Sequence, residues 1–239
     1  MKMLYNIVQY LLVGDYMNYI SVAIDGPAGA GKSSISKELA KKLNYVYVDT
    51  GAIYRALAYT ALKNNLDTKL DVEKISALVL KTEIDLKYID GVQHIFVDNN
   101  DVTGFIRTPE VSRGASDVSA IPQVREALLA IQRSIAHQNN VLMDGRDIGT
   151  VVLPDATIKI FLTATIEERA KRRYKEMVEK GVECNFDDIK ADIAYRDNQD
   201  SNRAVAPLKP AEDSTIFDNS NYSFEESVNY LYNLIKEKI

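Results

Sequence analysis

The chain has 239 residues, of which 46% are hydrophobic and 26% are charged, and its formal net charge is -5. These values are typical of one compact globular domain, and the acidic balance argues against a protein that binds nucleic acid through a general basic surface. The sole cysteine, Cys184, excludes an intramolecular disulfide, so we expect a cytoplasmic location and interpret this residue as an incidental thiol.

Residues 1–19 are expected to form an extension that is not part of the folded core. The apolar-rich stretch from Leu4 to Val13 contains Asn6 and Gln9 and is too short to cross a bilayer, so we expect no association with a membrane. It also lacks the basic start and the cleavage site of a secretory signal. We interpret Met17 as the physiological start; a short ordered helix over the domain is the alternative.

Strands and helices alternate in the first third of the chain. A short apolar strand from Ile20 to Asp25 is followed by a glycine-rich turn. Apolar residues then recur every four positions, which predicts a helix from Lys32 to Leu43. A second strand and two further helices are expected at Tyr45–Asp49, Gly51–Asn64 and Asp71–Lys81. This alternation predicts a parallel sheet with right-handed crossovers.

The pattern then changes to that of an antiparallel hairpin. Two β-rich runs, Ile84–Tyr88 and Gln93–Val97, flank the dipeptide Asp90-Gly91, which is a strong hairpin signal. Because a hairpin is foreign to a doubly wound sheet, we interpret roughly Ala77–Arg113 as a small insert on the core.

The second half of the chain returns to alternating strands and helices. Prolines at helix starts, apolar runs and capping boxes predict these elements. They are helices starting near Pro109 and Pro122, strands at Val141–Asp144 and Ile158–Thr163, helices from Thr165 and over Phe186–Tyr195, a strand at Thr215–Asp218, and a helix capped at Ser223. No repeat or long linker interrupts them, so residues 20–239 are expected to form a single domain.

The segment from Gly26 to Ser33 matches the phosphate-binding loop pattern G-x-x-x-x-G-K-[ST]. Its glycines let the backbone N–H groups point inward, and the positive end of the following helix faces the bound phosphates. Lys32 is expected to reach the β- and γ-phosphates, and Ser33 is expected to bind Mg²⁺. The alternative is a glycine-rich turn without a ligand.

A phosphate-binding loop does not by itself separate kinases from nucleotide-dependent switches. No Asn-Lys-x-Asp guanine-reading motif is present, and Asp144 ends an apolar strand where a metal-binding carboxylate could lie. Three arginine-containing segments, Asp49–Arg55, Asp144–Asp147 and Arg196–Arg203, follow predicted strands or a helix. Ligands bind at the carboxyl edge of open α/β sheets, so the set favours a ligand site over a solvated surface.

Several strings together resemble the bacterial-type cytidylate kinases, from about Ile20 to the last helix. The strings are Asp25–Ser34, Asp49–Arg55, Gly104–Thr108, Asp144–Thr150, Lys159–Leu162 and Asn202–Leu208. The resemblance implies an α/β P-loop NTPase fold with three α/β/α layers, a central parallel five-stranded sheet, a nucleoside monophosphate (NMP) binding region with a small antiparallel β insert, and a lid. The implied core covers about 20–50, 114–165 and 205–239, the NMP-binding region about 51–113, and the lid about 166–204.

The same resemblance implies Mg²⁺-dependent transfer of the ATP γ-phosphoryl group to CMP or dCMP by a monomer, as part of pyrimidine nucleotide metabolism. The implied ATP-binding residues are Gly26, Pro27, Ala28, Gly29, Ala30, Gly31, Lys32, Ser33 and Ser34. Arg55, Arg146 and Arg203 are implied at the CMP phosphate, Ser116, Arg125 and Asp147 at cytosine, and Thr50, Tyr54, Arg196 and Asp200 at the sugar and bound nucleotide. Lys32, Arg146 and Arg203 are the implied catalytic residues, and Arg169, Arg172 and Arg173 the implied lid arginines.

Alternatives remain for individual residues and for the activity. Ser116 could lie on a helix surface, Tyr54 could pack in the core, and the lid arginines could form a solvated helix face. Thr50 stands where relatives often have serine, which keeps the hydroxyl group. A kinase for UMP, shikimate or dephospho-CoA is the nearest alternative activity, and a switch that binds partners and turns ATP over slowly is an alternative from another class.

Overall fold

The computed structural model describes residues 19–179 and 181–239. The extension expected over residues 1–19 and the start expected at Met17 lie outside the described residues, except for Tyr19.

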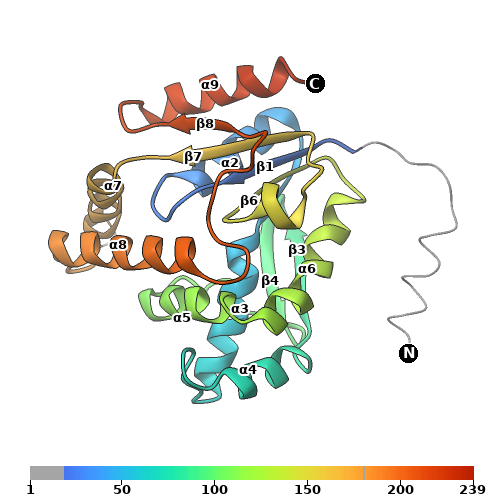
Figure 1. Cartoon of the computed structure of the whole chain (residues 1–239), viewed down its shortest axis with the longest axis vertical. Helices are drawn as coiled ribbons and strands as arrows, with labels where there is room; N and C mark the ends of the chain where they lie inside the picture. The colour runs from blue at the N-terminus through green and yellow to red at the C-terminus, as the bar shows by residue number, and fades with distance from the viewer. Residues whose placement is uncertain (1–18, 180) are drawn as a thin grey trace, which may run out of the picture.

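A parallel five-stranded sheet forms the centre of the molecule (Figure 1). Its strands in spatial order are β2 (Val46–Asp49), β6 (Val141–Gly145), β1 (Ser21–Asp25), β7 (Ile158–Thr163) and β8 (Thr215–Asp218). All neighbouring pairs are parallel, with Ile24 opposite Asp144 and Asp49 opposite the same residue on the other side. The carboxyl ends of β2, β6 and β1 therefore meet at one edge of the sheet.

Helices connect the strands and follow the last of them. They are α2 (Lys32–Leu43), α3 (Thr50–Lys63), α4 (Val72–Val79), α5 (Pro109–Ser119), α6 (Pro122–Ala136), the π-helix η1 (Ile148–Val152), α7 (Ile166–Glu179), α8 (Phe186–Asn202) and α9 (Phe224–Lys236). None of the helices in the described ranges is long and apolar enough to cross a membrane.

Alternating apolar side chains bury both faces of the sheet. On one face Ile24 and Leu142 pack with Leu39 of α2 and Leu231 of α9. On the other face Ala23, Val141 and Met143 pack with α6 and η1. A third cluster joins α3, α5 and α6 to a small antiparallel sheet. This period of two along buried strands lets helices cover both faces of the sheet, which gives the three α/β/α layers that the family resemblance implies.

The insert is a three-stranded antiparallel sheet formed by β3 (Ile84–Ile89), β4 (Val92–Val97) and β5 (Asn100–Asp101). The predicted hairpin is confirmed: Asp90 and Gly91 connect β3 to β4 with φ angles of 51° and 75°, the left-handed pair that a two-residue turn requires. The short strand β5 was not expected.

Two side chains of the insert bind the edge strand β2. The Gln93 side chain brackets the backbone of Asp49, accepting from its N–H at 2.8 Å and donating to its carbonyl oxygen at 3.3 Å. The Tyr88 hydroxyl donates to the carbonyl oxygen of Tyr47 at 2.9 Å. The insert therefore satisfies backbone groups of an edge that would otherwise be open.

The expected end of one helix near Tyr195 was wrong. Helix α8 continues to Asn202, so Arg196 and Asp200 lie on the helix, and Arg203 is its C-cap residue. The π-helix after β6 was also not predicted from the sequence.

Gln93→Leu should lower the free energy of unfolding by about 1–2 kcal/mol, because the N–H and carbonyl groups of Asp49 lose their partners. Urea denaturation measures this change, and Gln123→Leu at an exposed position of α6 is the matched control. Equal stability of the two variants would contradict the anchoring role of Gln93.

Candidate active site

The glycine-rich turn between β1 and α2 lies at the carboxyl edge of the sheet. Gly29 and Gly31 have φ angles of 76° and 86°, which residues with a side chain rarely adopt. At Gly26 an added Cβ would lie 1.9 Å from the carbonyl oxygen of Leu162, so strand β7 leaves no room for a side chain. The Lys32 ammonium donates to the carbonyl oxygen of Pro27 at 2.6 Å. The turn thus has the strand before it and the helix after it that a phosphate-binding loop requires.

Asp144 lies at the end of β6, beside this turn. Its carboxylate accepts hydrogen bonds from the Ser33 hydroxyl at 2.7 Å and from the Tyr47 hydroxyl at 3.1 Å. Burial raises the pKa of Asp144 to about 6, the nearby Asp49 carboxylate adds to this effect, and Lys32 opposes it.

The oxygens of Ser33 and Asp144 are the kind of ligand that Mg²⁺ prefers. Over residues 19–179 and 181–239, no group of three or more His, Cys, Asp or Glu side chains is arranged to hold a metal ion. Mg²⁺ in phosphoryl-transfer sites usually takes only one or two protein ligands together with substrate phosphates, so the pair fits this ion.

Asp49, the last residue of β2, orients two arginines. Its Oδ2 accepts from Arg55 at 2.8 Å and from Arg107 at 3.1 Å, while its Oδ1 accepts from the Ala52 N–H and caps α3. Burial alone would raise the pKa of Asp49, but the two guanidinium groups outweigh burial and hold it below its usual range. The Arg55 side chain is 17% exposed and the Arg107 side chain 55% exposed. Arg107 is therefore much the more accessible of the two.

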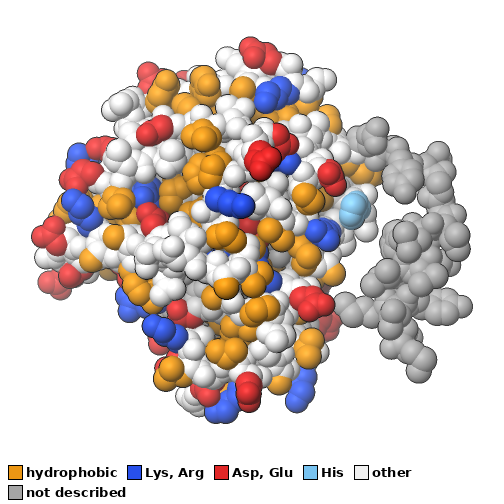
Figure 2. Space-filling view, viewed as in Figure 1, with side chains coloured by type: hydrophobic (Ala, Val, Ile, Leu, Met, Phe, Trp, Pro, Cys, Tyr) orange, Lys and Arg blue, Asp and Glu red, His pale blue; other side chains and the backbone are white. Residues whose placement is uncertain are grey.

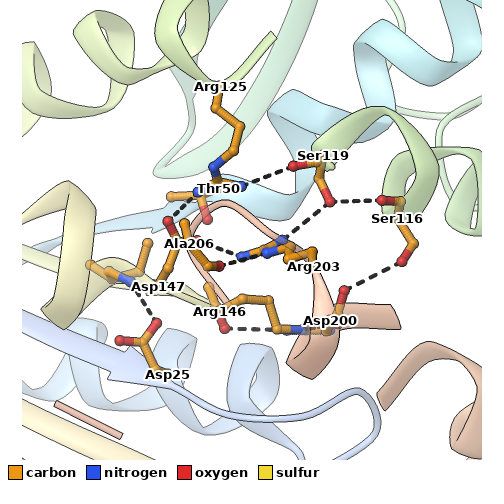
Figure 3. A network of polar contacts seen from close by, with 12 residues as sticks. Asp25, Thr50, Ser116, Ser119, Arg125, Arg146, Asp147, Asp200, Arg203 and Ala206 are labelled. Atoms are coloured by element: carbon orange, nitrogen blue, oxygen red, sulfur yellow. Dashed lines mark hydrogen bonds and ion pairs between the residues drawn. The ribbon is translucent and has the colours of Figure 1, made fainter. Parts of the chain in front are cut away.

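Arg203 and Arg125 share the carboxylate of Asp147 (Figure 3). Arg203 donates to Oδ1 at 3.2 Å, and Arg125 donates to Oδ2. Both also bind Ser119: Arg203 donates to its hydroxyl and Arg125 to its carbonyl oxygen, each at 3.2 Å. The Arg125 guanidinium lies 5.6 Å from the centroid of the Tyr54 ring, within the range of a cation–π contact.

Arg146 pairs with Asp200, which joins the end of β6 to helix α8. Its Nε donates to Asp200 Oδ2 at 2.8 Å, and the Ser116 hydroxyl donates to Oδ1 at 3.3 Å (Figure 3). Burial alone would lower the pKa of Arg146, but Asp200 outweighs burial and raises it. Three segments that are far apart in the sequence therefore meet at one carboxylate.

Buried positive charges crowd one another in this region. Burial lowers the pKa of Lys32 well below its usual value, and the positive charge of Arg146 lowers it further. Burial, again with Arg146, lowers the pKa of Arg196 to about 10. The Arg196 Nε finds no hydrogen-bond partner among the described residues. An anion bound between these side chains would relieve their repulsion.

The three arginines of α7 differ in their surroundings. Arg169 is buried and donates to the carbonyl oxygens of Ala28 and Ala164 and to the carboxylate of Asp197. Arg172 donates to the side chain and the backbone of Asn219, at 3.0 and 2.8 Å. Arg173 pairs with Glu176. Arg169 thus ties the glycine-rich turn to α7 and α8, whereas Arg172 and Arg173 reach the cleft.

A cleft of about 1140 Å³ brings most of the predicted site residues together. Those that line it are Ala28, Gly29, Gly31, Lys32, Ser33, Ser34, Thr50, Tyr54, Arg55, Ser116, Arg125, Arg146, Asp147, Arg172, Arg173, Arg196, Asp200 and Arg203. Gly26, Pro27, Ala30 and Arg169 do not line it.

Other residues of the cleft and its supports had no role assigned from the sequence. Arg107, Ser119 and Asn219 line the cleft, and Asp25 binds the turn that follows Asp147. Asn219 directly follows β8, so its place at the carboxyl edge of the sheet could have been inferred. Ser119 lies three positions after Ser116 on α5, which places the two on one face of that helix.

Comparison with known proteins identifies close relatives of this chain. The family model described as cytidylate kinase matches residues 22–237. A cytidylate kinase from Caldicellulosiruptor saccharolyticus is 53% identical over 210 residues, which cover 88% of this chain and 92% of that protein. A cytidylate kinase from Enterococcus faecalis is 48% identical over 222 residues, which cover 93% of this chain and 98% of that protein.

A solved structure shares the fold at low sequence identity. It is an uncharacterised protein from Eubacterium ventriosum, with a TM-score of 0.51 and 12% identity, covering 91% of this chain and 98% of that chain. The likeness concerns the arrangement of the sheet and helices alone.

Asp144→Asn should make the stability of the nucleotide-free protein less dependent on pH. Since the pKa of Asp144 is about 6 in the folded protein and lower in the unfolded chain, its contribution to stability falls as the pH rises from about 4 to above 6. Relative to wild type, the variant should therefore gain about 1 kcal/mol between about pH 5 and about pH 7.5.

Urea denaturation at the two pH values, without nucleotide or divalent cation, measures this gain. Asp155→Asn, at an exposed position, is the control for general charge effects. A stability difference between Asp144→Asn and wild type that stays constant across this range would contradict the raised pKa.

Proposed function

The chain belongs to the cytidylate kinase family, and from this membership we propose that it transfers the γ-phosphoryl group of ATP to CMP or dCMP, giving CDP or dCDP and ADP. One observation carries the proposal: a phosphate-binding turn and three arginines from distant segments line a single cleft. The lysine of the turn and these arginines are Lys32, Arg55, Arg146 and Arg203.

The donor nucleotide is proposed to bind the turn from Gly26 to Ser34. Backbone N–H groups at the start of α2 would donate to its phosphates, and Lys32 would leave the Pro27 carbonyl to reach the β- and γ-phosphates. A bound phosphate would also favour the ammonium form of Lys32, whose pKa is lowered by burial and by Arg146.

Mg²⁺ is the proposed metal, held by the Ser33 hydroxyl with Asp144 beside it. When bound, the ion supplies charge neutralisation at the phosphate oxygens of ATP.

The acceptor phosphate is proposed to lie against Arg55, Arg146 and Arg203. Guanidinium groups suit this task because their planar fork matches phosphate oxygens in charge and in geometry. Each of the three is held by a carboxylate, at distances between 2.8 and 3.2 Å. A carboxylate that accepts from only some N–H groups fixes the guanidinium plane and leaves other N–H groups available for phosphate. The Nε of Arg55 is one such buried donor without a partner among the described residues.

Arg125 and Asp147 are proposed to read cytosine, with Ser116 beside them. An arginine donates to the O2 and N3 acceptors of cytosine, and a carboxylate accepts from its N4 amino group. Uracil presents N3–H and O4 at the same positions, so both contacts would be mismatched and buried polar groups would lose their partners. Thr50, Tyr54, Arg196 and Asp200 are proposed to contact the sugar or the bound nucleotide.

The reaction needs alignment and charge stabilisation more than proton transfer. The acceptor phosphate is already anionic at neutral pH, so one of its oxygens can attack the γ-phosphorus in line while the bond to the leaving ADP oxygen breaks. Arg146 and Arg203 are proposed to offset the repulsion between the two anionic substrates. Orientation of two bound reactants can supply about 7–11 kcal/mol of barrier reduction. Alignment of the substrates is therefore the main contribution of such a cleft to the rate.

The regions of the chain are proposed to divide this work. The core covers about 20–50, 114–165 and 205–239, the NMP-binding region about 51–113, and the lid about 166–204. In support, Arg172 and Arg173 of the proposed lid line the same cleft as the phosphate-binding turn. We propose that the chain acts as a monomer, as the resemblance implies, and that it is cytoplasmic because it has a single cysteine.

The acceptor preference is the direct test of this function. ADP release should rise steeply when CMP or dCMP is added to enzyme with ATP and Mg²⁺, and much less with UMP, shikimate or dephospho-CoA. A coupled assay over this panel measures it. Slow ATP turnover that is indifferent to every acceptor would contradict the kinase assignment and favour a nucleotide-dependent switch.

Arg125→Met should narrow the preference for CMP over UMP by about 10- to 100-fold in kcat/KM, because cytosine loses a buried donor while methionine replaces the aliphatic part of the arginine side chain. Arg133 lies on the same helix, α6, and outside the cleft lining, so Arg133→Met is the matched control. If Arg125→Met keeps the wild-type CMP-to-UMP ratio, base recognition lies elsewhere.

A further inference from the structure

Asp25 caps the helix η1, which follows a different strand, β6. This residue ends β1 and lies near Asp147 (Figure 3). It is 4% exposed and accepts the Ile148 N–H and the Gly149 N–H, each at 2.7 Å and each with a different carboxylate oxygen. These N–H groups are the first two of η1 and have no partner within a helix. Asp25 therefore performs the capping that a side chain at the N-cap position ordinarily provides.

The N-cap residue of η1 is itself an aspartate, Asp147. Aspartate at this position usually accepts the N–H of the second or third helical residue, yet the Asp147 side chain makes no capping hydrogen bond. Its carboxylate instead binds Arg125 and Arg203 in the cleft. One aspartate of the pair thus caps the helix, and the other is free to face the cleft.

Space and charge both favour this division of roles. A Cβ added at Gly149 would lie 3.2 Å from the side chain of Lys159 and 3.4 Å from Asp25 Oδ2, so a side chain there would crowd the capping carboxylate. Burial raises the pKa of Asp25 to about 6 although its two N–H donors lower it, and the nearby negative charge of Asp147 contributes to the rise, as expected for two carboxylates that repel each other. With Asp25 in place, Asp147 is disfavoured from approaching the same N–H groups.

We propose that Asp25 is a positioning residue for acceptor recognition, because it takes the Gly149 N–H and so keeps the Asp147 carboxylate on Arg125 and Arg203. The inference rests on the proposed function, since it assigns base reading to Asp147 and Arg125. The proposal adds Asp25, the last residue of the strand before the phosphate-binding turn, to the determinants of acceptor specificity. Without Asp25, Asp147 turns back to cap its own helix and withdraws from both arginines.

The test is Asp25→Asn, assayed with CMP and with UMP at saturating ATP. The asparagine keeps the size of the side chain. Its NH2 group, however, faces one of the two N–H groups, which therefore loses its acceptor. The CMP-to-UMP ratio of kcat/KM is expected to fall at least tenfold, mainly through a higher KM for CMP. Because Asp25 also lies near Lys32, the ratio is the informative readout: any change on the ATP side cancels from it.

Arg133→Met is the matched control, because the Arg133 side chain binds the opposite end of η1. It donates to the carbonyl oxygens of Val151 and Val152, each at 2.9 Å. This variant loosens η1 without releasing the N–H groups at its start. It should lower the melting temperature and change the CMP-to-UMP ratio less than threefold.

A structure of Asp25→Asn gives a second readout. The Asp147 carboxylate is expected within hydrogen-bond distance of the Gly149 N–H and away from Arg125. If Asp25→Asn does not fold, Asp25→Glu replaces it in both measurements, because the longer side chain cannot place its oxygens on both N–H groups.

The outcomes separate the two proposals. A wild-type enzyme that does not distinguish CMP from UMP overturns the proposed function and this inference with it. A CMP-selective wild type with a folded Asp25 variant of unchanged ratio overturns the inference alone. Equal loss of selectivity in Arg133→Met also overturns it, since any loosening of η1 would then suffice.

Discussion

Three buried carboxylates at the ends of three adjacent strands are the constraint on which this site depends. Asp49, Asp144 and Asp25 end or nearly end β2, β6 and β1, and their exposed fractions are 5%, 3% and 4%. Like charges so close are tolerated only if each carboxylate has its own donors. Asp49 takes two arginines and a helix N–H, Asp144 takes two hydroxyls, and Asp25 takes two N–H groups. The assignment of donors to carboxylates fixes which segments meet at the cleft.

The arginines of the cleft are likewise held in place by specific partners. In a chain with a net charge of -5, local positive charge must be held in place by pairing, and Arg55, Arg146 and Arg203 each have an aspartate partner. The pairing does not neutralise the whole region, since burial and Arg146 still lower the pKa of both Lys32 and Arg196. A cleft of this kind is electrostatically prepared for two phosphate-bearing substrates, because anions would replace repulsion between cations with attraction.

Most of the fold could be predicted from the sequence, because its elements carry local signals. Alternating apolar strands, helical spacing and the Asp90-Gly91 turn all predicted elements that the structure contains. The failures have physical causes. Helix α8 continues past Tyr195 through Asp197, Asn198, Asp200 and Asn202, residues of weak helical propensity, and tertiary ion pairs of Asp197 and Asp200 help to hold that polar end. The π-helix has no sequence signature, because the carboxylate that supports it comes from residue 25.

The candidate site shows where a local pattern ceases to be informative. Motifs and the carboxyl-edge rule were sufficient to gather Lys32, Arg55 and Arg146. Helical spacing treats Arg169, Arg172 and Arg173 alike, although Arg169 binds the carbonyl oxygen of Ala28, 141 positions earlier in the chain. Capping rules likewise assign the start of η1 to the adjacent Asp147, whereas Asp25, 123 positions away from Ile148, takes that role. In both cases a distant partner changes what a side chain is free to do, and that exchange becomes visible only once the strands are placed side by side.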